Sequence, residues 1–264
     1  YSFCIITGGS RPEKVARQIA SIRALGLESF EILVGGNITG IPDDVRTVDL
    51  AQVAKAGRLG KMRNALGRLA KFDHLVVSDD DILFDASFAE GLKRFGEGYD
   101  VMAVRILNTD RSRFWDWATT GGLKGSVLLD YWESDPDIYV TGGICVLKTT
   151  TLDRVQWDES RGFYQREDVD FSSRAKAAGF PIRFNPFSVV VHDDDRYSRV
   201  GRVVYQFDHL LGEAVQSHAT RSAAETIHFL GHARRIAGSY PERQAAVQAI
   251  AQRLGVALDP VPSP

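Results

Sequence analysis

The sequence predicts an α/β fold in which a mostly parallel central sheet is flanked by helices and followed by a helical extension. Apolar runs rich in β-branched residues alternate with amphipathic segments over residues 1–202, as in successive βαβ units. Residues 203–258 show helical patterns only, and the Pro-rich residues 259–264 form an expected tail. We expect the α/β domain to consist of two halves, 1–106 and 107–202.

Composition narrows the class of protein. The 264 residues carry a formal charge of −2 and are 44% hydrophobic, which is ordinary for a soluble globular chain and argues against nucleic-acid binding. No apolar run approaches the length of a membrane span, and no signal peptide is visible. Cys4 and Cys145 each lie in an apolar run, so we expect buried, reduced thiols and a reducing compartment.

The first predicted βαβ unit comes from strands at 2–7 and 31–34 that enclose a helix beginning at Pro12 and ending at Gly26. Residues 108–137 show no clear periodicity and hold three of the four tryptophans, so we expect an irregular insertion. Further strands are predicted at 46–50, 75–77, 101–106, 182–184 and 188–192, and at 138–147 with a break at Thr141-Gly142-Gly143; further helices are predicted at 60–70, 86–95 and 168–178.

Three consecutive aspartates follow the buried strand at 75–77. Asp79, Asp80 and Asp81 stand at its carboxyl end, where carboxylates repel one another unless a cation or hydrogen-bond donors meet them. In an extended segment Asp79 and Asp81 face the same side, and such oxygen ligands suit Mg²⁺ or Mn²⁺. A solvated acidic turn explains the same residues equally well.

Basic residues cluster in two places. Lys61 and Arg63 open a predicted helix, and Arg196 and Arg199 lie on the polar loop after the last predicted strand. The guanidinium groups of Arg196 and Arg199 can bind phosphate oxygens in a bidentate manner, so they suit an anionic ligand. The alternative for Lys61 and Arg63 is that they are ordinary exposed helix charges. The alternative for Arg196 and Arg199 is a solvated loop whose arginines pair with residues 193–195.

Two further polar sites lie in the second half of the domain. Glu167 and Asp168 stand at the start of a predicted helix, and His192 ends a predicted strand. An Asp at a helix N-cap needs no other role. An imidazole at a sheet edge suits a metal ion, but the aspartates that follow His192 also offer it hydrogen-bond partners.

Four motifs follow one another over residues 2–200. They are Ile5-Ile6-Thr7 with Arg11-Pro12, Gly60-Lys61-Met62-Arg63-Asn64, Ser78-Asp79-Asp80-Asp81, and Arg166-Glu167-Asp168 followed by His192. In this order and spacing they resemble the GT-A glycosyltransferases, most closely the family 2 enzymes that use nucleotide-sugar donors. The second strand of that family often ends in an acidic residue that holds the nucleobase or ribose, whereas Gly35-Gly36-Asn37 stands here.

The resemblance implies a Rossmann-like GT-A fold with a nucleotide-binding first half and an acceptor-binding second half. It implies a metal-dependent hexosyltransferase that moves a sugar from an NDP-sugar to an acceptor hydroxyl. Asp81 would bind Mn²⁺ or Mg²⁺ directly, Asp79 would contact the metal shell or the ribose, and His192 would complete the protein ligands. The implied donor-binding residues are Thr7, Gly9, Arg11, Asn37, Lys61, Arg63, Asp79, Asp80, Gly143, Arg196 and Arg199.

The same resemblance implies an inverting transfer with Asp168 as the base and Glu167 as its support. The acceptor is a glycan, a lipid-linked molecule or a small molecule, and we expect no nucleic-acid partner. We expect a cytoplasmic protein, with attachment to the inner face of the membrane as a second option. The apolar residues of the helical extension need a partner, which the domain itself or a second copy of the chain would supply.

Two other functions fit part of the sequence. A sugar-phosphate nucleotidyltransferase has a Gly-rich, Arg-containing turn that residues 8–14 loosely match. A non-catalytic module that binds nucleotide-sugars or glycans would need neither the base nor the complete metal set.

Overall fold

The computed structural model describes residues 1–109, 111, 113–122, 125–129, 131, 133–163, 165–193, 210–212, 214–219, 222–237 and 241–258. The chain divides into two compact units. The first comprises Tyr1–Ser126 and Glu133–Asp193, and the second Val127–Trp132 and Asp194–Pro264. The domain boundary predicted at residue 202 lies outside the described residues.

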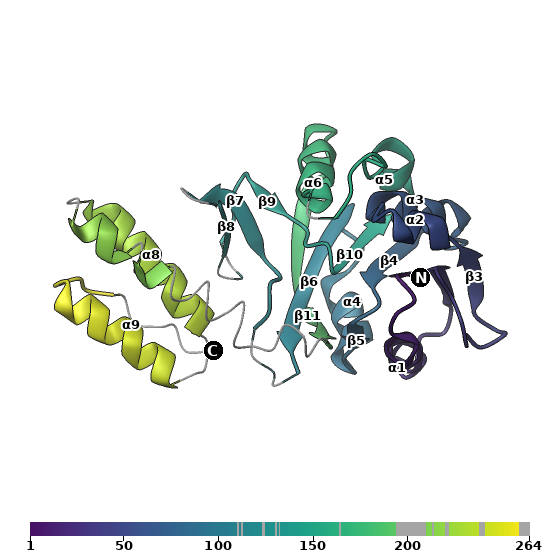
Figure 1. Ribbon diagram of the computed structural model, residues 1–264, viewed down its shortest axis with the longest axis horizontal. Helices are drawn as coiled ribbons and strands as arrows, with labels where there is room; N and C mark the ends of the chain where they lie inside the picture. The colour runs from purple at the N-terminus through teal and green to yellow at the C-terminus, as the bar shows by residue number, and fades with distance from the viewer. Residues whose placement is uncertain are drawn as a thin grey trace. The chain divides into compact units, whose positions relative to one another are not determined.

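The first unit is built on an eight-stranded sheet with the order β3-β2-β1-β4-β10-β6-β11-β5 (Figure 1). The first four strands are mutually parallel, β10 runs antiparallel to both of its neighbours, and β6 and β11 are parallel. This arrangement confirms the predicted α/β class. The strands are β1 (Ser2–Thr7), β2 (Glu31–Gly36), β3 (Arg46–Asp49), β4 (His74–Asp79), β5 (Ile82–Phe84), β6 (Val101–Asn108), β10 (Ile144–Lys148) and β11 (Ile182–His192).

Helices cover both faces of this sheet. Figure 1 shows α1 and α4 on one side and α2, α3, α5 and α6 on the other. The face of α1 formed by Val15, Ile19 and Ile22 is buried in the main apolar core with Phe3 and Ile5 of β1. The helices are α1 (Pro12–Arg23), α2 (Ala51–Lys55), α3 (Leu59–Leu69), α4 (Ser87–Phe95), α5 (Thr149–Arg154) and α6 (Glu167–Ala177).

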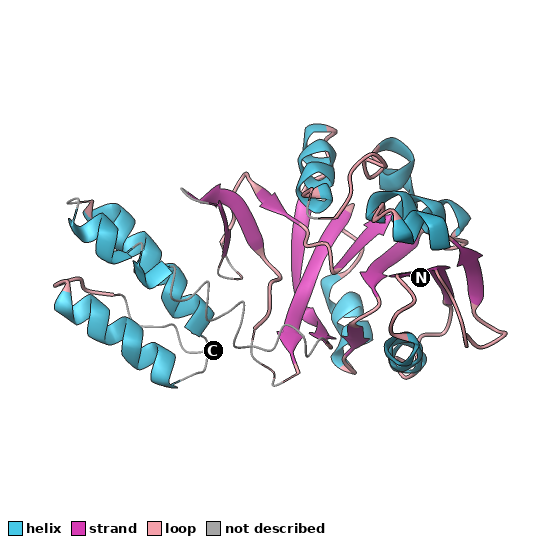
Figure 2. Cartoon of the chain, viewed as in Figure 1, coloured by secondary structure: helices cyan, strands magenta, loops and turns pink. Residues whose placement is uncertain are grey.

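Two predictions about the second half of the first unit are wrong. The strands expected at 182–184 and 188–192 are one strand, β11, whose register on β6 shifts between Asn185 and Val189. That shift accommodates Pro186, which has no N–H to donate to a ladder. The expected irregular insertion contains β7 (Ala118–Gly122) and β8 (Gly125–Leu128), which form a second sheet with β9 (Ile138–Tyr139) in the order β8-β7-β9 (Figure 2).

The described part of the second unit is mainly helical, as predicted. Residues 210–212 and 214–219 are helical, and α8 (Ala223–Ala237) packs on α9 (Pro241–Arg253). Phe229, Leu230 and Val247 are buried in this unit. Among the described residues, no helix combines the length and the apolar character needed to cross a bilayer.

Candidate functional site

The acidic motif lies in the turn between β4 and β5. Arg11, at the N-cap of α1, places Nη2 2.6 Å from Asp80 Oδ1 and Nη1 3.2 Å from Asp81 Oδ2. Thr7, the last residue of β1, donates its hydroxyl to Asp80 Oδ2 at 2.6 Å. Burial raises the pKa of Asp80, and the Thr7 and Arg11 contacts oppose this shift. The Asp80–Asp81 carboxylates are therefore partnered, which excludes a freely solvated acidic turn.

Asp79 ends β4 and faces a different cation. Its Oδ1 accepts a hydrogen bond of 3.2 Å from Arg63 Nη2, while its own N–H donates to the carbonyl of Gly143 at 2.9 Å. Burial raises the pKa of Asp79 to about 7, and the charge of Arg63 opposes the rise. Asp79 therefore belongs to the α3 side of the motif, whereas Asp80 and Asp81 belong to the α1 side.

The predicted base, Asp168, lies in the first turn of α6. Its Oδ2 accepts from Gly142 N–H at 3.1 Å and its Oδ1 accepts from Val169 N–H at 2.8 Å. Burial is the largest cause that raises the pKa of Asp168, followed by the charge of Glu167. Arg166, which precedes the pair, has φ +56°, an unusual left-handed conformation for a residue other than glycine. Such backbone strain is common at functional sites.

Glu167 is buried and accepts a 3.0 Å hydrogen bond from Arg63 Nη1. Arg63 is therefore shared between Glu167 and Asp79, residues that lie 104 and 16 positions from it in the sequence. The Arg63 side chain is only 2% exposed. Arg63 is therefore not an ordinary exposed helix charge, which was the alternative to its predicted role in donor binding.

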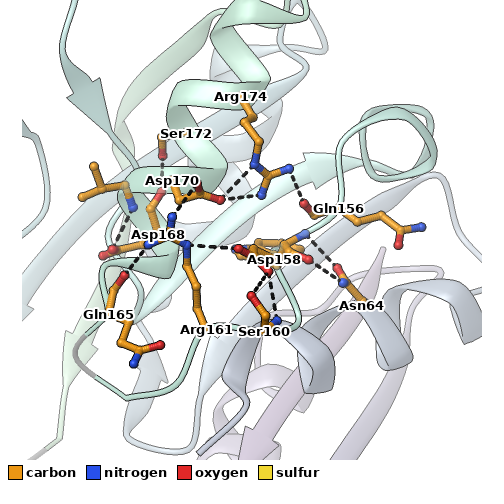
Figure 3. Close-up of polar contacts among 12 residues, drawn as sticks. Asn64, Gln156, Asp158, Ser160, Arg161, Gln165, Asp168, Asp170, Ser172 and Arg174 are labelled. Atoms are coloured by element: carbon orange, nitrogen blue, oxygen red, sulfur yellow. Dashed lines mark hydrogen bonds and ion pairs between the residues drawn. The ribbon is translucent and has the colours of Figure 1, made fainter.

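The loop that leads into α6 is held by a network of polar contacts (Figure 3). Asn64 donates to the carbonyl of Trp157 at 2.9 Å and accepts from the N–H of the same residue at 3.0 Å. Arg161 contacts Asp170 Oδ1 at 3.0 Å and Asp158 Oδ2 at 3.3 Å. This loop is therefore anchored to both α3 and α6 before it reaches Asp168.

His192, at the end of β11, lies beside the acidic turn. Its Nε2 is 3.8 Å from Asp81 Oδ2, and the following residue, Asp193, donates its N–H to the carbonyl of Asp81 at 2.7 Å. The ring of Phe114 stacks on His192 with centroids 4.1 Å apart. A carboxylate oxygen and an imidazole nitrogen at this separation suit two protein ligands of one divalent ion.

Asp79, which we predicted as a third metal ligand, does not lie with Asp81 and His192. Within the described ranges, no three His, Cys, Asp or Glu side chains gather as a metal cluster. The physical reason is that Asp79 turns to Arg63 while Asp81 faces Arg11 and His192. The residues present therefore fit an ion with two protein ligands whose remaining positions are filled by water or by a bound diphosphate.

The first two strand ends are closely packed at their backbones. Gly36 has φ +147°, and a Cβ added there would lie 1.9 Å from the carbonyl oxygen of Thr7. A Cβ added at Gly9, φ +80°, would lie 2.2 Å from the carbonyl oxygen of Asn37. Glycine is required at both positions, and Asn37 itself is exposed beside them.

The remaining predicted donor residues are not brought together in the same way. Lys61 is exposed on α3, and Gly143 lies in the turn before β10, where its carbonyl accepts from Asp79. Arg196 and Arg199, with most of the loop they occupy, lie outside the described residues.

Sequence reasoning missed a polar face on α1. Lys14 donates to the carbonyl of Asp193, Arg17 Nη2 lies 2.5 Å from Asp193 Oδ2, and Gln18 donates to Ser78 Oγ at 2.8 Å. Arg11, Lys14 and Gln18 are spaced at i, i+3 and i+7, which places them on one helix face. That spacing is visible in the sequence and could have predicted the polar face.

Many solved structures align with this chain, and two of them serve as examples. The catalytic domain of Drosophila β1,4-galactosyltransferase 7, in complex with xylobiose, aligns at 13% identity and a TM-score of 0.48, covering 74% of this chain and 71% of that chain. Residues 1–349 of S. aureus TarS align at 14% identity and a TM-score of 0.47, covering 96% of this chain and 81% of that chain. No protein-family model matches the sequence, and no curated protein matches it.

Proposed function

We propose that the chain is a GT-A-like, metal-dependent glycosyltransferase that moves a sugar from a nucleotide-sugar donor to an acceptor hydroxyl. The supporting observation is that one guanidinium, that of Arg63, contacts both Asp79, the first carboxylate of the acidic motif, and Glu167, the neighbour of Asp168. Group transfer from an anionic leaving group needs cationic stabilisation on one side and a proton acceptor on the other. In this proposal Arg11 supplies the cation beside the leaving group, and Asp168 accepts the proton.

The donor diphosphate is assigned to the α1 side of the acidic turn. The Arg11 side chain is 20% exposed, and its guanidinium is already oriented by Asp80 and Asp81. Asp81 and His192 are the residues that would hold Mn²⁺ or Mg²⁺. When bound, such an ion supplies electrostatic stabilisation of the charge that develops on the leaving diphosphate.

Asp168 is assigned as the base that takes the proton of the acceptor hydroxyl. Two backbone N–H groups orient its carboxylate, and its position in the first turn of α6 favours the ionised form. In an inverting transfer the hydroxyl attacks the anomeric carbon from the face opposite the diphosphate. Glu167 supports Asp168, because its hydrogen bond with Arg63 ties the start of α6 to α3.

The nucleoside contacts are assigned to the ends of β1 and β2. Asn37 stands exposed where the resembling family often has a carboxylate, next to backbone that packs too closely for any side chain at Gly9 or Gly36. An amide both donates and accepts hydrogen bonds, whereas a carboxylate only accepts. Selection among nucleobases is therefore expected to be less strict here than with a carboxylate.

The test is a donor panel with two product readouts. Purified protein is incubated with UDP-, GDP-, CDP- and dTDP-linked hexoses, each with Mn²⁺, with Mg²⁺ and with EDTA, and released nucleoside diphosphate is measured. We expect release from at least one donor in the presence of metal, because water serves as a slow acceptor when no other is present. Separate reactions contain a hexose 1-phosphate and an NTP. Pyrophosphate release there, without NDP release from any donor, would identify a nucleotidyltransferase instead.

A further inference from the structure

Arg63 is the most enclosed cation of the site. It lies in α3 between the buried residues Met62 and Asn64, with its side chain 2% exposed. Its Nη1 donates to Glu167 Oε1 at 3.0 Å, and its Nη2 donates to Asp79 Oδ1 at 3.2 Å and to the carbonyl of Gly142 at 2.8 Å. One planar group thus joins three segments that are far apart in the sequence.

The charge of Arg63 is balanced inside the protein. Burial disfavours the charged form, but Asp79 and Glu167 more than compensate, so the pKa of Arg63 is raised above its usual value. Its hydrogen bonds are directed at protein acceptors. A guanidinium fixed in this way is unsuited to follow a donor that binds and leaves, in contrast to the more exposed Arg11.

The peptide of Gly142 connects Arg63 to the proposed base. The Gly142 carbonyl accepts from Arg63, and the Gly142 N–H donates to Asp168 Oδ2 at 3.1 Å. The next carbonyl, that of Gly143, accepts from Asp79 N–H at 2.9 Å. The turn before β10 therefore bonds to the end of β4 on one side and to α6 on the other, and Arg63 bonds to all three.

We propose that Arg63 is a positioning residue that fixes Asp79, the first residue of the acidic motif, relative to Asp168, and that it does not bind the donor. This inference rests on the proposed function and deepens it. Without Arg63, the Gly142 carbonyl loses its hydrogen-bond donor, and the buried Glu167 and the half-buried Asp79 lose their shared cation. Asp168 would then be displaced from the acceptor hydroxyl. A displacement of about 1 Å can lower the rate about 100-fold.

The first test compares Arg63→Lys and Arg63→Met with Arg68→Met. Arg68 is on the same helix but has a side chain that is 51% exposed, so it is the matched control. With the NDP-sugar selected by the donor panel, we expect both Arg63 variants to lose about 10–100-fold in kcat with KM for the donor changed by less than about threefold. Arg68→Met should stay within about twofold of wild type, since exposed ion pairs contribute little. A large rise in KM with kcat intact would show that Arg63 binds the donor and would overturn the proposal.

Arg63→Met leaves Asp79 and Glu167 without a cation, so the variant can fail to fold. The double variant Arg63→Met/Glu167→Gln removes one charge of each sign, so the net charge of the cluster stays the same. We expect it to fold, as judged by circular dichroism and thermal melting, and to remain at least about tenfold slower than wild type. Wild-type turnover in the double variant would mean that Arg63 only balances charge.

A readout that does not depend on turnover separates this inference from the proposed function. The charged side chains that shift the pKa of Asp168 are Glu167 of α6, which raises it, and Arg63 of α3, which lowers it. Carboxyl-carbon NMR, assigned with Asp168→Asn, should show the Asp168 pKa raised in Arg63→Met and unchanged in Arg68→Met. An unchanged pKa in Arg63→Met would refute the coupling, even if wild-type protein released no NDP from any donor.

Discussion

The ring of Phe114 stacks face to face on that of His192, with the centroids 4.1 Å apart and the planes at 9°. Phe114 comes from the segment that follows β6, whereas His192 ends β11. The stack fixes the plane of the imidazole, and Nε2 then lies 3.8 Å from Asp81 Oδ2. A residue with no polar side-chain atom therefore orients one of the two proposed metal ligands.

Removing this ring should weaken metal binding without removing a ligand. We expect Phe114→Leu to raise the Kd for Mn²⁺, measured by calorimetry with the preferred NDP present, by about 10-fold, at the low end for residues that orient a metal ligand. His192→Ala should raise it further, because it removes the ligand itself. Phe187→Leu is the control, since Phe187 is also half-buried but stacks on Arg94. Equal Kd values for Phe114→Leu and wild type would show that Phe114 does not orient His192 for metal binding.

The packing of β1 against β2 predicts a sharp difference between two neighbouring glycines. Gly36→Ala should destabilise the protein by about 1–3 kcal/mol for the left-handed backbone conformation alone, and the clash with the Thr7 carbonyl adds to this. Gly8→Ala has open space around its Cβ and should stay within about 0.5 kcal/mol of wild type. Urea unfolding followed by fluorescence measures both. Similar urea midpoints for the two variants would contradict the close packing of Gly36 on the Thr7 carbonyl.

The environment of Asp168 predicts how activity depends on pH. Burial and the charge of Glu167 raise the Asp168 pKa, so the residue becomes protonated at a higher pH than an ordinary Asp. A base works only when ionised, so kcat/KM should fall as the pH drops through this raised pKa, at a higher pH than for an ordinary Asp. In Arg63→Met the falling limb should move to still higher pH, because Arg63 lowers the Asp168 pKa. A limb that stays in place in this variant would contradict the assignment.

The two cysteines should be unreactive in the folded protein. Cys4 of β1 and Cys145 of β10 both pair with Val77 of β4, on opposite sides of that strand, so a whole strand separates them. Both thiols are buried, and burial raises the pKa of each. We expect no reaction with a thiol reagent such as DTNB under native conditions and two equivalents in denaturant. Reaction of either thiol before unfolding would show that the sheet opens locally.

Local patterns predicted most of the fold. The spacing of Val15, Ile19 and Ile22 gave α1, and the apolar run before Asp79 gave β4, because each pattern depends only on near neighbours in the sequence. The single strand β11 was not predicted, since Asn185 and Pro186 are typical of a break. Only pairing with β6 shows that a register shift accommodates them.

The site was predictable in its residue types but not in its pairings. The acidic motif and the Glu167-Asp168 pair are visible as short runs of carboxylates. The partner of Glu167, Arg63, lies 104 positions away and reads in the sequence as an ordinary helix charge. Likewise, nothing in the local sequence shows that Arg11 lies on Asp80 and Asp81 while Arg63 takes Asp79. Tertiary packing decides these pairings.

The most direct measurement is the turnover of Asp168→Asn with the preferred donor, set beside its affinity for the corresponding NDP. Asn keeps the size of the side chain but cannot take a proton, so turnover should fall by about 10²–10⁴-fold while the Kd for NDP changes by less than about threefold. Asp153→Asn, on the exposed side of α5, is the control and should match wild type. Turnover near the wild-type rate in Asp168→Asn, or a product that retains the anomeric configuration of the donor, would contradict the role given to Asp168.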